Sequence, residues 1–118
     1  MAIGIGKHLV LELAEALNRH DRIAARECVA EDMRFIGVFG PPLEGADAYL
    51  DAMLRLGARQ EVVKCIAEQD DVVCFYELGL PSRPDVQLWG AGWFSIKNGR
   101  IASIRVVFDP IPLSKGQK

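Results

Sequence analysis

Residues 87–109, QLWGAGWFSIKNGRIASIRVVFD, contain the pattern that decides the fold. Two segments in which apolar and polar side chains alternate flank Asn98-Gly99, a dipeptide typical of a tight turn between antiparallel strands. The stretch therefore predicts a β-hairpin with strands at 87–97 and 100–109.

The register of this hairpin decides which residues share a face, and two registers compete. A two-residue turn pairs Lys97 with Arg100 and mixes apolar with polar residues on each face. A three-residue loop, with Gly99 left-handed, pairs Ile96 with Arg100 and separates the two kinds of residue. We prefer the second register for that separation. It places inward Leu88, Gly90, Gly92, Phe94, Ile96, Ile104, Val106 and Phe108, and outward Trp89, Ala91, Trp93, Ser95, Arg105 and Val107.

The segments before the hairpin predict three helices and three further strands. Apolar residues recur at helical spacing over 7–17, and Asp21 is a favourable N-cap for a second, short helix over 22–29. A third helix runs from about Ala46 to Gly57, a residue typical of helix C-termini. Strands are expected at 33–39, 61–69 and 72–80, with a loop at 81–85.

Helices followed by strands predict a single α+β domain over the 118 residues, with three N-terminal helices laid against a curved antiparallel sheet. Residues 1–6 are expected to form a flexible arm, and 111–118 a tail. The net charge is −2 and the 14 Lys and Arg residues are scattered, so neither nucleic acid nor an anionic membrane is expected as a partner. The apolar stretch 9–17 carries two glutamates and indicates neither a signal peptide nor a membrane span.

Cysteine and histidine content argues against a metal site. Cys28, Cys65 and Cys74 are odd in number and form no C-x-x-C pair, so we expect buried thiols in a reducing cytoplasm rather than a disulfide framework or a zinc site. His8 and His20 are the only histidines, and both are expected at the surface. We predict no metal and no cofactor.

Four motifs carry a resemblance to a known family, and together they span roughly residues 7–110. They are Ala16-Leu17-Asn18-Arg19-His20-Asp21, Ala30-Glu31-Asp32, the segment 94–101 and the segment 104–110. In this order the chain resembles the nuclear transport factor 2-like superfamily, particularly its SnoaL-like and ketosteroid isomerase-like members. The resemblance implies a cone-shaped sheet around a pocket. Members include isomerases, polyketide cyclases, epoxide hydrolases and non-catalytic binding modules, so the fold alone does not decide the function.

The catalytic positions that the resemblance implies are empty of acid–base side chains. Ketosteroid isomerases use a tyrosine, an aspartate base and a protonated aspartic acid. Matching the motifs places these on Leu13, Gly37 and Gly92. The aspartate that cyclases and epoxide hydrolases carry in the last strand falls on Val106. The best-known chemistries of the family are therefore not expected.

Tyr76 and Glu77 remain as candidate catalytic residues. They are adjacent in a strand, so one of them faces inward, and the neighbouring apolar residues favour neither. An inward Glu77 would serve as a general base or acid with a raised pKa. An inward Tyr76 would orient a ligand carbonyl.

The pocket is expected to bind a hydrophobic small molecule. The two inward glycines leave volume on the inner face of the sheet, although they could equally serve to let the sheet bend. Two functions stay open: a non-catalytic binding module, or an isomerase, cyclase, hydratase or epoxide hydrolase acting on a hydrophobic carbonyl or polycyclic substrate. The outward patch of Trp89, Ala91, Trp93 and Val107 predicts a homodimer through the outer sheet face. The predicted pocket lining is Leu13, Met53, Gly90, Gly92, Phe94, Ile104, Val106 and Phe108.

Overall fold

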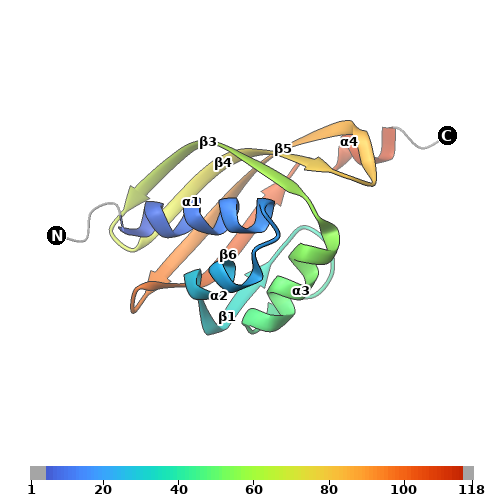
Figure 1. The fold of residues 1–118 in the computed structure, drawn as a ribbon. Helices are drawn as coiled ribbons and strands as arrows, with labels where there is room; N and C mark the ends of the chain where they lie inside the picture. The colour runs from blue at the N-terminus through green and yellow to red at the C-terminus, as the bar shows by residue number, and fades with distance from the viewer. Residues whose placement is uncertain (1–4, 116–118) are drawn as a thin grey trace.

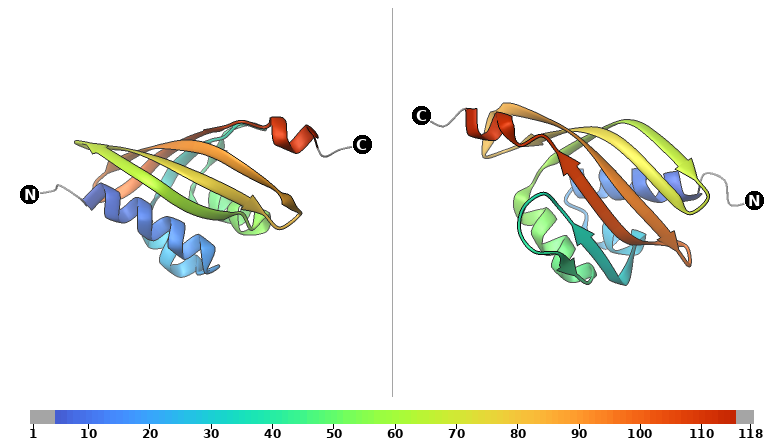
Figure 2. Two further views of the ribbon diagram at one scale, coloured as in Figure 1. Left: turned by 90° about the horizontal axis from the view of Figure 1, so that it is seen from above. Right: turned by 180° about the vertical axis from the view of Figure 1, so that it is seen from behind.

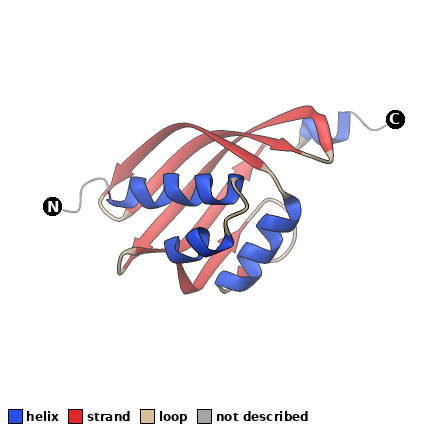
Figure 3. Ribbon diagram, viewed as in Figure 1, coloured by secondary structure: helices blue, strands red, loops and turns tan. Residues whose placement is uncertain are grey.

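Three helices lie on one face of a six-stranded sheet in residues 5–115, the part of the chain that the computed structural model describes (Figure 1). The helices are α1 (Ile5–Asn18), α2 (Arg22–Cys28) and α3 (Ala46–Leu56). Figure 3 shows this helical layer in front of the strands. The strands are β1 (Val29–Ile36), β2 (Leu43–Glu44), β3 (Arg59–Glu68), β4 (Asp71–Leu80), β5 (Arg83–Lys97) and β6 (Arg100–Phe108), and a short helix α4 (Ile111–Lys115) follows them. The α+β prediction is confirmed.

The sheet is mixed, which corrects the prediction of a purely antiparallel sheet. Its strand order is β2-β1-β6-β5-β4-β3. All neighbouring pairs are antiparallel except β1 and β6, which run parallel. A parallel pair needs a long crossover, and α3 with the β3–β5 meander supplies it. The views in Figure 2 show the sheet curving over α1, α2 and α3, whereas the short helix α4 lies apart from them at the far end of β5.

The β5–β6 hairpin has the predicted faces but not the predicted turn. Lys97 pairs with Arg100 across a two-residue turn in which Asn98 and Gly99 have φ angles of 54° and 76°. Both positive angles are those of a type I′ turn, which matches the twist of the strands. Ser95 pairs with Ser103 farther along, so the register shifts and one extra residue of β6 is accommodated. A two-residue turn alone would mix apolar and polar residues on each face, and the bulge in β6 separates them again.

Several element boundaries also differ from the sequence predictions. Helix α1 begins at Ile5, so Ile5 and Gly6 belong to a helix rather than to the predicted arm, and residues 1–4 and 116–118 lie outside the described residues. Strand β1 starts at Val29 rather than Met33. Strand β5 starts at Arg83, which makes the predicted loop at 81–85 part of a hairpin. The pairing of β5 with β6 starts only at Gly90, so Pro84 lies where no β6 partner requires its missing N–H.

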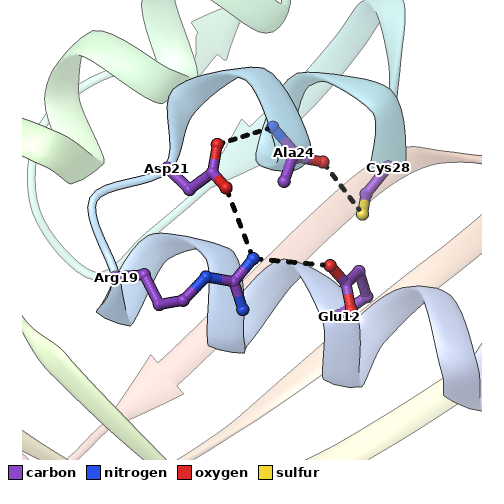
Figure 4. A network of polar contacts seen from close by, with 5 residues as sticks. All are labelled: Glu12, Arg19, Asp21, Ala24 and Cys28. Atoms are coloured by element: carbon purple, nitrogen blue, oxygen red, sulfur yellow. Dashed lines mark hydrogen bonds and ion pairs between the residues drawn. The ribbon is translucent and has the colours of Figure 1, made fainter.

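The turn between α1 and α2 is held by a cap and two ion pairs (Figure 4). Asp21 Oδ1 accepts a hydrogen bond from the backbone N of Ala24 at 3.0 Å, which confirms Asp21 as the N-cap of α2. Arg19 Nη2 lies 3.5 Å from Asp21 Oδ2 and 3.7 Å from Glu12 Oε2. These ion pairs are solvent-exposed, so the cap contributes more to the stability of the turn than they do.

A disulfide joins Cys65 on β3 to Cys74 on β4, which corrects the prediction of three buried free thiols. The two residues are direct partners in the β3–β4 register, with Cα atoms 4.2 Å apart. Cys28 is a free, buried cysteine. Burial raises the pKa of its thiol to about 11, helped by the charges of Glu12 and Glu27. The cysteine argument for a reducing compartment therefore does not apply to the Cys65–Cys74 pair.

Candidate functional site

A cavity of about 100 Å³ lies between the helices and the inner face of the sheet. Helices α1 and α3 contribute to one wall, and strands β3 to β6 form the other. Its lining is overwhelmingly apolar, with no Asp, Glu, His, Lys or Arg side chain. The lining residues are Val10, Leu13, Ala14, Phe35, Tyr49, Met53, Leu56, Ala58, Gln60, Val62, Cys74, Tyr76, Leu78, Phe94, Ile104, Val106 and Phe108.

The cavity contains most of the predicted pocket residues. Phe94, Ile104 and Val106 reach the cavity wall from β5 and β6, beside Leu13 and Met53 of the helices, as predicted. Phe108 also lines the cavity at the end of β6, where its ring packs edge-on against Phe39 with centroids 5.9 Å apart. The predicted residues in the lining are Leu13, Met53, Phe94, Ile104, Val106 and Phe108.

Gly90 and Gly92 face inward and are buried, but they do not line the cavity. A Cβ atom at Gly92 would lie 2.9 Å from Phe94 Cε1 and 3.2 Å from the Tyr76 hydroxyl oxygen. A Cβ atom at Gly90 would lie 2.8 Å from the carbonyl oxygen of Val107. The space that the glycines leave is thus already occupied by these neighbours, and the prediction that it forms pocket volume is corrected.

Tyr76 faces the cavity and Glu77 does not. Tyr76 is 4 % exposed, whereas Glu77 lies on the outer face of the sheet, where its Oε1 accepts a hydrogen bond from Gln87 Nε2. Strand alternation explains the outcome, since Val72 and Cys74 are also fully buried on the Tyr76 face. The role considered for an inward Glu77 therefore has no basis in this geometry.

A second tyrosine, Tyr49 on α3, lies in the cavity wall together with Tyr76. Tyr49 is 3 % exposed, and its ring packs against Phe35 with centroids 5.2 Å apart. Burial raises the pKa of both phenols above their usual range, and the proximity of Tyr76 raises the pKa of Tyr49 further. Both hydroxyls therefore stay protonated at neutral pH and can donate hydrogen bonds.

Gln60 on β3 is the other polar side chain in the lining. Its backbone is fixed by Asn18 at the end of α1, whose Nδ2 donates to the Gln60 carbonyl and whose Oδ1 accepts from the Gln60 N–H, both at 2.8 Å. The sequence prediction missed Tyr49 and Gln60 as cavity residues. Tyr49 is one of the buried residues of α3, and its helical spacing is that of an ordinary core residue, so its hydroxyl is the one sequence signal that could have indicated a cavity role.

No cluster of three or more possible metal ligands occurs within residues 5–115. None of the helices in this range is long and apolar enough to cross a membrane. His8 and His20 are both exposed, as the sequence predicts.

Comparison with known proteins identifies the family. Residues 10–104 match the SnoaL-like domain family. The chain belongs to the SnoaL-like domain family. It is similar to a structure described as an NTF2-like protein of unknown function from Cytophaga hutchinsonii, at 30% sequence identity and a TM-score of 0.84, covering 92% of this chain and 94% of that chain. No curated protein matches the chain.

Two further structures share the fold of this SnoaL-like domain at lower identity. One is described as an LEH-like epoxide hydrolase from M. tuberculosis, at 20% identity and a TM-score of 0.81, covering 95% of this chain and 88% of that one. The other is a de novo designed protein with a curved β-sheet, at 18% identity and a TM-score of 0.78, covering 94% and 90%. A protein described as an epoxide hydrolase and a designed protein thus share this architecture, so the function has to be argued from the cavity.

Three of the four positions matched to family catalytic residues lie at or beside the cavity. Leu13 and Val106 line it, and the Cβ position of Gly92 is directed at Phe94 and Tyr76, which line it as well. Their side chains carry no acid or base. At these positions the SnoaL-like domain described here therefore carries no ionisable side chain.

Proposed function

We propose that this SnoaL-like domain binds a small, uncharged, largely apolar molecule in its internal cavity and does not catalyse acid–base chemistry. One observation carries the proposal: a mostly apolar lining in which tyrosines are the only residues able to exchange a proton. Their raised pKa values make them unsuitable as bases at neutral pH. The isomerase, cyclase, hydratase and epoxide hydrolase alternatives all require a group that abstracts a proton or activates water, and the lining supplies no such base.

The size of the cavity limits the ligand. A dry protein cavity of about 150 Å³ lined by aliphatic and aromatic side chains accommodates benzene. The cavity here, at about 100 Å³, accepts a single ring only with small movements of its walls. Met53 is unbranched and flexible, and Leu56 is 50 % exposed, so these two residues can give way. A polycyclic substrate is too large for the cavity in this form.

The test is a titration with methylenecyclohexane, an uncharged six-membered ring, followed by methyl NMR. Methyl signals of Leu13, Ile104 and Val106 should shift in a saturable way, because these residues line the cavity. The methyls of Ile23, which is 78 % exposed on α2, serve as an internal control and should not shift.

A pair of matched variants assigns the binding to the cavity. Ala14→Leu adds three carbon atoms at the cavity wall and should abolish the shifts while the fold is retained. Ala91→Leu adds the same atoms on the outer face of β5, next to Phe75 and Val107, and should bind as wild type does. Binding that survives Ala14→Leu, or no saturable shift in the wild type, would contradict the proposal.

A further inference from the structure

We infer that the hydroxyl groups of Tyr49 and Tyr76 are the ligand-anchoring donors of the cavity, and that the ligand is a small, uncharged carbonyl compound with one ring or a short chain. This inference rests on the proposed binding function and assigns the class of ligand.

The first support is that neither hydroxyl has a partner in the protein. Among the described residues, no hydrogen bond is formed by the side-chain oxygen of Tyr49 or Tyr76. No buried side-chain oxygen or nitrogen in this part of the chain is fully enclosed without a partner, so each phenol oxygen keeps some accessible surface. Both residues are at least 96 % buried, and the space they share is the cavity. Each hydroxyl is thus free for a guest in that space.

The second support is the choice of residue. Phenylalanine would fill the same volume in the cavity wall, as Phe35 and Phe94 do nearby. Buried tyrosines usually find an acceptor for their hydroxyl groups. The described residues supply no such acceptor to Tyr49 or Tyr76, and a ligand with an accepting oxygen would supply one.

The third support concerns the kind of ligand that these groups fit. The phenols are protonated donors, and no charged side chain lines the cavity to balance an ionised guest. A carboxylate, phosphate or ammonium group would therefore be buried without a counter-ion, which is strongly unfavourable. A carbonyl oxygen accepts two hydrogen bonds and brings no donor of its own, so it satisfies both phenols and leaves no polar hydrogen unpaired.

The local geometry holds the two donors in place. Tyr76 lies on β4, between β5 and the edge strand β3, and its hydroxyl oxygen is 3.2 Å from the Cβ position of Gly92, beside the ring of Phe94. The missing side chain at Gly92 thereby makes room for this hydroxyl. Tyr49 approaches from α3, the opposite wall, with its ring against Phe35. A ligand between these walls has a tyrosine on each side and is otherwise surrounded by a mostly apolar lining.

The experiment compares two ligands of equal shape in four proteins. Cyclohexanone and methylenecyclohexane differ only in having an oxygen or a CH₂ group on the ring. The dissociation constants of both are measured by methyl NMR for the wild type, Tyr49→Phe, Tyr76→Phe and the double variant. The ratio of the two constants within one protein is then compared between proteins, which cancels the different cost of removing each ligand from water.

Each Tyr→Phe change should reduce the relative preference for the ketone by about 3- to 10-fold, the value of one hydrogen bond. The affinity for methylenecyclohexane should stay within about 2-fold of wild type, because the variants keep the apolar lining. If the tyrosines had only a structural role, each Tyr→Phe change would lower the affinities for both ligands equally. If the wild type binds neither ligand, the proposed function itself fails. If it binds both and the ratio is the same in all four proteins, only the present inference fails.

A spectroscopic measurement on the wild type gives the same answer without relying on variants that could misfold. The carbonyl stretch of bound ¹³C-labelled cyclohexanone should move to lower frequency than in a hydrocarbon solvent, as expected for an oxygen that accepts hydrogen bonds. A stretch at the hydrocarbon frequency would overturn the inference.

Discussion

Alanine substitutions at three glycines test how the inner face of the sheet is packed. A Cβ atom at Gly79 on β4 meets nothing within 4 Å, and one at Gly92 meets the ring of Phe94 at 2.9 Å and the Tyr76 hydroxyl at 3.2 Å. One at Gly90 meets the backbone oxygen of Val107 at 2.8 Å. A ring can rotate away from a methyl group, whereas a paired strand cannot move without breaking its ladder. The expected order of stability is therefore Gly79→Ala, then Gly92→Ala, then Gly90→Ala.

The magnitudes follow from two opposing effects. Replacing glycine by alanine stabilises by about 0.4–1 kcal/mol through the unfolded chain, and this is the whole effect expected at Gly79. Overpacking costs about 1–3 kcal/mol, so Gly92→Ala should lose roughly 1–2 kcal/mol net, and Gly90→Ala about 2 kcal/mol or more. For 118 residues, an unfolding entropy of about 2.1 cal/mol/K per residue converts 1 kcal/mol into roughly 4 °C.

The assay is thermal and urea unfolding of the three variants, combined with the methylenecyclohexane titration. Gly92→Ala should also lower the affinity for methylenecyclohexane, because the ring of Phe94, which lines the cavity, should be pushed into it by the added methyl group. Gly79→Ala is the matched control and should bind as wild type does. A Gly92→Ala protein as stable as Gly79→Ala, with unchanged binding, would refute the packing described here.

Three further predictions concern the outer face, the disulfide and the buried ionisable groups. Trp89 and Trp93 are 52 % and 49 % exposed, and the register places Phe75, Ala91 and Val107 in one row beside them, so we propose that a second copy of the chain covers this face. The double variant Trp89→Ala/Trp93→Ala should sediment as a monomer at micromolar concentration, and a wild type that is also monomeric would contradict the proposed dimer. Reducing the Cys65–Cys74 bond, whose cysteines have a sequence separation of 9, should lower the free energy of unfolding by about 2–3 kcal/mol through the loss of loop closure in the unfolded chain. A thiol titration of the denatured protein should find one reactive thiol before reduction and three after it, and three thiols before reduction would disprove the bond. Burial raises the pKa of Cys28 from 9.0 to about 11, so the free energy of unfolding should fall as the pH rises from 9 through 11, because the thiol ionises first in the unfolded chain. The fall should be steeper above pH 10, since burial also raises the pKa values of Tyr49 and Tyr76 above their ordinary value of 10.0. Urea midpoints that do not change over this range would contradict the burial of these groups.

The local features of the fold could be predicted from the sequence because they depend on neighbours along the chain. The cap at Asp21, the left-handed Gly57 after α3 and the faces of β5 and β6 all follow from short patterns. The predicted three-residue turn was wrong because a two-residue turn followed by a bulge in β6 also keeps the apolar residues on one face. Such a bulge depends on how the whole strand packs, which the turn residues do not show.

Long-range pairings were the harder part. The parallel pairing of β1 with β6 joins segments that are far apart in the sequence, so no local pattern predicts it. The disulfide was accessible in principle: a two-residue turn at Gln69-Asp70 pairs Cys65 with Cys74, although counting cysteines pointed the other way. Strand alternation predicted that one of Tyr76 and Glu77 faces the cavity, but the choice between them and the arrival of Tyr49 from α3 depend on tertiary packing.

The most direct measurement of the central claim is a crystal structure of the protein with cyclohexanone. We expect the ring between Met53 and Phe94, and the ketone oxygen within hydrogen-bonding distance of the hydroxyl groups of Tyr49 and Tyr76. A cavity that stays closed at saturating ligand, or a ketone bound with its oxygen turned away from both phenols, would contradict it.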